Sequence, residues 1–204
     1  MPNRDKFDSI GDYYNDLVNK FGHDPRACDY GHLNSQKIKF EALSSGFSHD
    51  DKTILDIGCG FADYYDFLNK KFKNISYSGV DISPNMIEHA SKRHPNLKLE
   101  LRNVFNNPPD STYNIVTANG IFYLLGERSQ ELMQTFIQKM FDMAEELIVF
   151  NSLSAWAAEK EVGEFYADPL KTIAFCRSLS PWVTLRHDYH PRDFTVHVYK
   201  NRNV

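Results

Sequence analysis

Short apolar runs alternate with helical segments from residue 53 onward, and this alternation is the feature that most constrains the fold. The pattern predicts strands at Thr53–Ile57, Ser76–Asp81, Leu97–Asn103, Tyr113–Ala118 and Glu146–Asn151, and helices at Asp63–Phe72, Pro84–Arg93, Ser129–Ala144 and Pro169–Leu179. Two further runs, at Trp182–His190 and Phe194–Lys200, predict a C-terminal antiparallel hairpin. We therefore expect an α/β fold with a doubly wound, mostly parallel sheet of seven strands.

The first 45 residues precede this alternation and predict a helical cap. Apolar side chains recur at helical spacing over residues 5–21, and residues 34–45 form a second predicted helix that begins at Asn34 or Ser35. We expect one domain over residues 1–204, in which a cap at 1–45 lies over a ligand-binding core at 53–200.

Composition excludes several classes of protein. A chain of 204 residues with 42% hydrophobic content suits one globular domain, and a net charge of −4 argues against a general binder of nucleic acid. The apolar stretches are too short to span a membrane, and the N-terminus MPNRDKFDSI does not resemble a signal peptide. The three cysteines are widely spaced, and no two of them form a CxxC motif, so we expect neither disulfides nor a metal site. These features predict a cytoplasmic protein with no membrane partner.

The stretch ILDIGCGFADYYDFL at residues 54–68 predicts a nucleotide-binding turn. Gly58 and Gly60 follow the first strand, at the sheet edge where open α/β sheets bind ligands. A dinucleotide site requires a third glycine, where the pyrophosphate approaches the helix N-terminus. Here that position is Asp63, whose carboxylate would repel a phosphate. The pattern therefore argues against a dinucleotide.

Two further carboxylates narrow the choice of ligand. Asp56 precedes the glycines, and Asp81 ends the second strand, where an acid is well placed to accept both ribose hydroxyls. Three carboxylates without a phosphate cradle indicate a ligand with a ribose and positive charge. S-adenosylmethionine has both and no phosphate.

These two motifs, ILDIGCGFADYYDFL and SGVDISPNMIEHA, resemble the first and second motifs of the class I S-adenosylmethionine-dependent methyltransferases. The resemblance covers about residues 53–200 and includes the C-terminal hairpin. It implies a Rossmann-like methyltransferase fold in which Asp56 and the Gly58-Cys59-Gly60 turn shape the methionine pocket. It further implies that Asp81 holds the ribose, Ile82 lies against the adenine and Asn103 meets the adenine amino group. The backbone around Ala118-Asn119-Gly120 would contact the methionine ammonium.

The segment GHDPRACDYGHLNSQKIKF is similar to the lead-in of small bacterial methyltransferases. The resemblance implies that a basic residue on the helix before the first strand pairs with the cofactor carboxylate, and Lys39 is the candidate. An ordinary solvated lysine is the alternative.

Methyl transfer requires a base only when the acceptor must lose a proton, so a catalytic group can be nearly invisible in sequence. The candidates for a catalytic role are Asn119, Tyr14 and His23, and the candidates for substrate contact are Tyr14, Arg26, Tyr30, Tyr123, Asn151 and Tyr166. Packing is the alternative role for the tyrosines, and solvation is the alternative for His23 and Arg26. His187 and His190 face opposite sides of an extended strand and are not expected to share a metal.

The sequence thus predicts an S-adenosylmethionine-dependent methyltransferase that modifies an oxygen or nitrogen of a small molecule. An RNA methyltransferase, an NAD(P)-dependent oxidoreductase and a catalytically idle cofactor-binding module remain alternatives. The acidic balance disfavours the first of these, and Asp63 disfavours the second.

Overall fold

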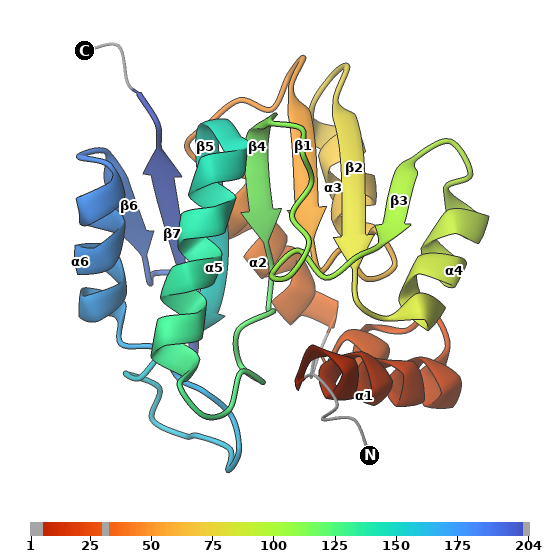
Figure 1. Cartoon of the computed structure of the whole chain (residues 1–204), viewed down its shortest axis with the longest axis horizontal. Coiled ribbons are helices and arrows are strands. Elements are labelled where there is room, and N and C mark those ends of the chain that lie inside the picture. The colour runs from red at the N-terminus through yellow and green to blue at the C-terminus, as the bar shows by residue number, and fades with distance from the viewer. Residues whose placement is uncertain (1–5, 30–32, 202–204) are drawn as a thin grey trace.

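The computed structural model describes residues 6–29 and 33–201, and within these residues seven strands form one sheet (Figure 1). The order of strands across the sheet is β3-β2-β1-β4-β5-β7-β6. The strands are β1 (Thr53–Ile57), β2 (Ser76–Asp81), β3 (Lys98–Leu101), β4 (Tyr113–Ala118), β5 (Ala144–Leu153), β6 (Val183–Arg186) and β7 (Asp193–Tyr199). The strand order reverses between β1 and β4, which places a binding crevice beyond their carboxyl ends.

The strand directions confirm the predicted mostly parallel sheet and its C-terminal hairpin. Strands β1 to β5 pair in parallel, whereas β7 pairs antiparallel with both β5 and β6. Strand β3 is shorter than predicted, since it lies at the edge and has one partner. Strand β5 is longer, because its last residues continue to pair with β7 as far as Leu153 and Asp193.

Helices cover both faces of the sheet, as expected for a doubly wound fold. They are α1 (Lys6–Phe21), α2 (Leu33–Leu43), α3 (Asp63–Lys71), α4 (Pro84–Arg93), α5 (Ser129–Met143) and α6 (Pro169–Leu179), with a short 3₁₀ helix η1 (Pro25–Cys28). Two of the α-helices begin with a side-chain cap followed by proline: Ser83 accepts from Met86 N, and Asp168 accepts from Leu170 N and Lys171 N.

Each face of the sheet has its own buried apolar cluster. One cluster joins Val116, Ile148 and Val196 to Met140 of α5 and Cys176 of α6. The other joins a second set of strand residues to helices α2, α3 and α4: Ile54, Ile115, Val149, Phe40, Leu68 and Ala90. The alternation of side chains along buried strands accounts for this division.

Helix α1 lies across the carboxyl ends of the parallel strands, beneath the sheet in Figure 1. Its Phe7 packs into the cluster on the α5 face. Gly11 allows a close approach to the loop after β2, because a Cβ at this position would come within 2.9 Å of the backbone oxygen of Ile82. The helix therefore covers the edge at which the sequence motifs converge. Among the described residues, no helix has the length and apolar character needed to cross a membrane.

Candidate active site

The glycine turn after β1 requires left-handed backbone. Gly58 and Gly60 have φ angles of 73° and 53°, which are strained for residues with a side chain. A Cβ on Gly58 would lie 2.4 Å from Cγ2 of Ile121. The amides of Gly58 and Cys59 both donate to the carbonyl of Val80, at 2.8 and 3.1 Å. The turn is thus tied to the end of β2 and held close to the loop after β4.

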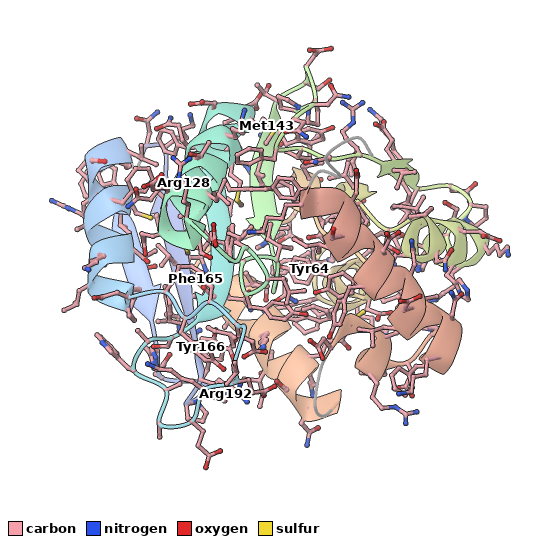
Figure 2. The ribbon with its side chains drawn as sticks, turned by 60° about the horizontal axis from the view of Figure 1, so that its bottom comes forward. Tyr64, Arg128, Met143, Phe165, Tyr166 and Arg192 are labelled. Carbon is pink, nitrogen blue, oxygen red and sulfur yellow. The ribbon has the colours of Figure 1, made fainter. Side chains whose placement is uncertain are left out.

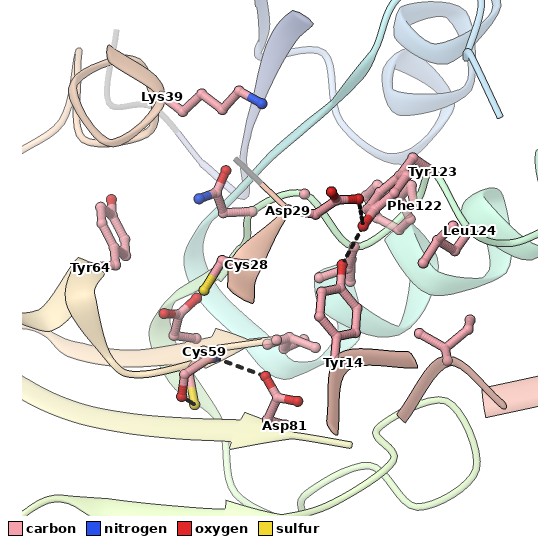
Figure 3. A pocket seen from close by; sticks show the side chains of 18 of the residues that line it. Tyr14, Cys28, Asp29, Lys39, Cys59, Tyr64, Asp81, Phe122, Tyr123 and Leu124 are labelled. Carbon is pink, nitrogen blue, oxygen red and sulfur yellow. Dashed lines mark hydrogen bonds between the residues drawn. The ribbon is translucent and has the colours of Figure 1, made fainter. Parts of the chain in front are cut away.

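Asp81 connects this turn to the loop that begins α4. Its Oδ2 accepts from Gly60 N at 2.8 Å (Figure 3), and its Oδ1 accepts from Ser83 N at 2.9 Å. The residue is 8% exposed, and burial raises the pKa of its carboxyl although these backbone hydrogen bonds favour the anion. Asp81 is therefore a fixed hydrogen-bond acceptor at the end of β2, where the resemblance places a ribose.

Asp56 is a buried carboxylate with one unsatisfied oxygen. Tyr77 donates its hydroxyl to Oδ2 at 2.5 Å, whereas Oδ1 has no hydrogen-bond partner among the described residues. Burial, with a smaller contribution from the charge of Asp81, raises the pKa of Asp56 to about 7 against the hydrogen bond from Tyr77. A buried acceptor without a partner is costly. This side chain is thus suited to a ligand that brings a donor or a positive charge.

These groups line one cavity of about 480 Å³, within the roughly 300–1,000 Å³ usual for small-molecule sites. Most of the predicted residues contribute to its lining: Tyr14, Lys39, Asp56, Gly58, Cys59, Gly60, Asp63, Asp81, Ile82, Asn103, Asn119, Gly120 and Tyr123. Five predicted residues lie outside the lining: His23, Arg26, Ala118, Asn151 and Tyr166. Tyr30 lies outside the described residues. The cavity extends from the carboxyl end of β2 to the first residue of β7, Asp193.

Asp63 has close polar neighbours, among them the cation Arg93, that the sequence argument did not include. Its Oδ1 lies 2.9 Å from Nη1 of Arg93 and 3.0 Å from Nε2 of His23, and Gln36 donates to its Oδ2 at 3.3 Å. Arg93 compensates much of the negative charge that was expected to repel a phosphate. The argument for a cationic ligand therefore rests mainly on Asp56 and Asp81.

Lys39 forms an ion pair inside the cavity. Its Nζ lies 3.0 Å from Oδ1 of Asp193, and the two side chains are 12% and 4% exposed. A solvated lysine, the alternative considered from sequence, does not describe this burial. Pairing of Lys39 with a cofactor carboxylate stays a prediction. Such a carboxylate would have to share Lys39 with Asp193, its partner in the free protein.

Asn151 holds the loop after β4 in place through two hydrogen bonds. It is fully buried, its Oδ1 accepts from Gly120 N at 2.7 Å, and its Nδ2 donates to Oδ1 of Asn119 at 2.6 Å. Asn119 and Gly120 line the cavity, whereas Asn151 does not. The expected substrate contact of Asn151 is thus replaced by a positioning contact.

Replacing Asn151 with alanine is expected to lower the free energy of unfolding by about 2–4 kcal/mol, because two hydrogen bonds to the partly buried Asn119 and Gly120 are lost and a fully buried side chain is truncated. Urea unfolding followed by circular dichroism measures this change. Asn107→Ala, at an exposed asparagine in the loop after β3, is the matched control and should change stability little. Equal stabilities of the two variants would contradict the positioning role.

A tyrosine network joins α1 to the loop after β4 (Figure 3). The hydroxyls of Tyr14 and Tyr123 are 2.8 Å apart, and Tyr123 donates to Oδ2 of Asp29 at 2.8 Å. Tyr13 donates to the same oxygen at 3.1 Å. Burial, together with the charge of Asp29, raises the pKa of both Tyr14 and Tyr123 far above the usual range. The two phenols are therefore protonated at neutral pH and suited to donating hydrogen bonds.

Three other predicted residues have different surroundings. His23 contacts Asp63 and Phe61, and Arg26 is exposed and paired with Asp24. The hydroxyl of Tyr166 accepts from Nη2 of Arg192 at 2.8 Å, and Figure 2 shows these two side chains next to each other. The structure therefore does not bring His23, Arg26 and Tyr166 into the cavity.

Several lining residues were missed by sequence analysis. They are charged or titratable and come from segments far apart in the chain: Cys28, Asp29, Arg102, Glu161, Glu164, His190, Arg192 and Asp193. Nothing in their local sequence distinguishes them from surface residues. One signal was available: His190 to Asp193 directly precede the last strand. Because that strand is antiparallel to β5, its first residue lies at the ligand-binding edge of the sheet.

The two C-terminal histidines have separate partners. His187 Nε2 lies 2.7 Å from the hydroxyl of Ser154, and His190 Nδ1 lies 2.6 Å from Oδ2 of Asp193. Within the described parts of the chain, no group of three histidine, cysteine or acidic side chains is arranged to hold a metal ion.

Comparison with known proteins identifies the type of domain. Residues 55–144 match a family model described as a methyltransferase domain. A Mycobacterium tuberculosis protein named as a methyltransferase is 27% identical over 158 residues, which cover 74% of this chain and 95% of that protein. Malonyl-[acyl-carrier protein] O-methyltransferase 1 of Ilyobacter polytropus is 31% identical over 88 residues, which cover 40% of this chain and 33% of that enzyme.

Solved structures support the same fold. The magnesium protoporphyrin IX methyltransferase of Synechocystis, crystallised with S-adenosylhomocysteine, superposes with a TM-score of 0.69 at 11% identity. The match covers 97% of this chain and all of that one. The chain therefore has the fold of the class I S-adenosylmethionine-dependent methyltransferases, and its residues 55–144 match a methyltransferase domain, which confirms the resemblance inferred from its two motifs.

Proposed function

We propose that this protein transfers a methyl group from S-adenosylmethionine to an oxygen or nitrogen atom of a small molecule. The observation that carries the proposal is the single cavity that runs along the strand ends from Asp81 to Asp193. One end has the acceptors that a ribose and a cation require. The other end, near Asp193, would take the acceptor molecule.

The residues at the first end fit the cofactor. Asp81 is held in place by two backbone amides, and its remaining acceptor capacity suits the ribose hydroxyls. Asp56 has an unsatisfied oxygen that suits the positive charge of the methionine part. Gly58 and Gly60 have no side chain to block this approach. When bound, S-adenosylmethionine supplies an electrophilic methyl group on a sulfonium.

The covering of the cavity favours a small acceptor. Helix α1 supplies Phe7, Ile10 and Tyr14 to the lining, and η1 supplies Cys28. The hydrogen bonds among Tyr14, Tyr123 and Asp29 hold this cover against the loop after β4. Such an enclosure excludes water from an in-line displacement, which benefits from a dry and oriented site.

The relatives differ in their named acceptors, which are a malonyl group on a carrier protein and magnesium protoporphyrin IX. Each name supports methyl transfer to a metabolite-like acceptor rather than to nucleic acid. The net charge of −4 supports the same choice.

Isothermal titration calorimetry with S-adenosylmethionine and S-adenosylhomocysteine tests the cofactor. We expect binding of each at one site per chain, and no binding in a fluorescence titration with NADH. Binding of NADH alone would support the oxidoreductase alternative. A salt-sensitive gel shift with RNA would overturn the choice of a small-molecule acceptor.

A further inference from the structure

We propose that the hydroxyl of Tyr64 donates a hydrogen bond to the carboxylate of S-adenosylmethionine and so selects ligands that carry a complete amino acid group. This inference rests on the proposed function and deepens it. Tyr64 is the second residue of α3 and lines the cavity. Neither the glycine turn nor the resemblance to known methyltransferases assigned it a role.

The hydroxyl of Tyr64 is a buried polar group without a partner. The residue is 2% exposed, and its hydroxyl forms no hydrogen bond with any described residue. Its ring packs against Phe40 and Phe67, with ring centroids 5.0 and 6.2 Å away. This packing accounts for an aromatic ring, which phenylalanine would also supply, but not for a hydroxyl. Because a buried polar group without a partner is costly, we expect a ligand to satisfy this one.

The ligand has to bring an acceptor. Burial raises the pKa of Tyr64 well above its usual value, and the charge of Asp56 raises it further. The phenol is therefore protonated at neutral pH, and its proton needs an acceptor. Oδ1 of Asp56 is an acceptor in the same cavity, but it forms no hydrogen bond with this hydroxyl.

The other tyrosines of the cavity differ from Tyr64 in this respect. The hydroxyls of Tyr14 and Tyr123 are 2.8 Å apart, and Tyr123 donates to Asp29. Both of these phenols thus have partners in the free protein. Among the described tyrosines that line the cavity, Tyr64 alone has an unused donor.

Asp56 and Tyr64 have complementary requirements. Oδ1 of Asp56 lacks a donor, and the hydroxyl of Tyr64 lacks an acceptor. An amino acid group supplies both, because its ammonium donates and its carboxylate accepts. The methionine part of S-adenosylmethionine is such a group. The other described lining residues with a buried unpartnered atom, Arg192 and Asp193, belong to the opposite end of the cavity.

The neighbours of Tyr64 favour the carboxylate over the nucleoside as its ligand. Phe40 of α2, whose ring contacts Tyr64, lines the cavity together with the adjacent Lys39. Lys39 is the cation predicted to pair with the cofactor carboxylate. Asp81, the expected ribose acceptor, lies apart from Tyr64 across the cavity in Figure 3. The carboxylate is therefore the acceptor group of the cofactor that we expect on the α2 side.

The first test measures affinity by isothermal titration calorimetry with S-adenosylhomocysteine, S-adenosyl-3-thiopropylamine and 5′-methylthioadenosine. The second ligand lacks only the carboxylate of the first, and the third lacks the whole amino acid group. Tyr64→Phe should weaken binding of S-adenosylhomocysteine by about 10- to 100-fold, because a hydrogen bond to a charged group is lost. It should change the other two affinities by no more than about twofold, since neither ligand has the acceptor.

Tyr113→Phe is the matched control. It removes a hydroxyl from a buried tyrosine of β4 that does not line this cavity, and it should leave all three affinities unchanged. If Tyr64→Phe weakens S-adenosyl-3-thiopropylamine as much as S-adenosylhomocysteine, the hydroxyl contacts the amine or the nucleoside and the assignment to the carboxylate is wrong.

The second test measures thermal unfolding without ligand. Tyr64→Phe should raise the Tm of the free protein by about 2–4 °C, because it removes a buried hydroxyl that has no partner. A fall in Tm would show that the hydroxyl has a partner in the free protein, which contradicts the proposal. At one concentration of S-adenosylhomocysteine, the wild-type protein should gain more in Tm than the variant.

The outcomes separate this proposal from the proposed function. If the wild-type protein binds S-adenosylhomocysteine and Tyr64→Phe binds it as tightly, the role of Tyr64 is overturned and the cofactor assignment stands. If the wild-type protein binds none of the three ligands, the proposed function is overturned and the role of Tyr64 with it.

Discussion

Replacing Asp81 with asparagine is expected to weaken the binding of S-adenosylhomocysteine by about 100-fold or more. A carboxylate that accepts from both ribose hydroxyls contributes about 1.5–3 kcal/mol for each hydrogen bond, and each 1.4 kcal/mol corresponds to a factor of ten in affinity. The amide group of asparagine also turns a donor toward Gly60 N or Ser83 N, which are themselves donors. Asp81→Asn therefore loses one of the two backbone hydrogen bonds that connect the glycine turn to the loop before α4.

Calorimetry with S-adenosylhomocysteine measures this loss, and thermal unfolding shows whether the variant is folded. Glu88→Gln makes the same chemical change on exposed α4, where Glu88 pairs with Lys92, and should leave the affinity unchanged. An Asp81→Asn variant that melts like wild type and binds as tightly would contradict the assignment of the ribose site to the end of β2.

Replacing Asp56 with asparagine is expected to stabilise the free protein, and to do so more at pH 8 than at pH 5. Burial raises the pKa of Asp56 from 3.8 to about 7. The folded protein therefore binds more protons than the unfolded chain between these values, so stability falls as pH rises through this range. Above pH 7 the buried charge costs about 4 kcal/mol, at about 1.4 kcal/mol per pKa unit.

At pH 8 the asparagine variant avoids this cost, which corresponds to a rise in Tm of about 10 °C for a chain of this size. At pH 5 the gain should be less than half as large, since Asp56 is then already protonated in the folded state. Asp50→Asn is a control of opposite sign, because hydrogen bonds from Lys73 N and Ser48 lower the pKa of Asp50. It should lower Tm at pH 8. An equal Tm for Asp56→Asn and wild type at pH 8 would contradict the buried charge.

The asparagine variant should also bind S-adenosylhomocysteine more weakly, because an amide replaces the acceptor whose Oδ1 has no partner in the free protein. Stability and binding would then change in opposite directions at one residue. Such a trade-off is expected where a site retains an unsatisfied group for its ligand.

Much of the sheet could be predicted because its strands have local signatures. The bounds of β1, β2 and β4 agree with the predicted ranges, since each is an apolar run that ends at a polar residue or a turn. The predicted length of β3 was too great. Its sequence favours a strand beyond Leu101, but its one partner, β2, ends there. Pairing decides such ends, and the partner is not visible in the local sequence.

The same distinction applies to the candidate site. The glycine turn and Asp81 are recognised because each belongs to a short continuous motif that directly follows a strand. Arg93 contacts Asp63 across 30 residues only because α3 and α4 lie on the same face of the sheet. His190 was assigned to a predicted strand and Asp193 to the connection before the last strand. Neither was expected at the cavity, since their proximity to it depends on β7 lying beside β5. Lys39 is intermediate: its place in the cavity was predicted, but its partner on β7 was not.

The central position of β7 has a consequence for how the protein is made. All seven residues of β7 are buried, and they pair with β5 on one side and β6 on the other. During synthesis the ribosome releases β5 and β6 first, so the nascent chain carries two open strand edges until Asp193–Tyr199 emerge. Open edges favour pairing with other chains. The interval before β7 is released is therefore when this protein most needs a chaperone, and ribosomal pausing there should increase aggregation.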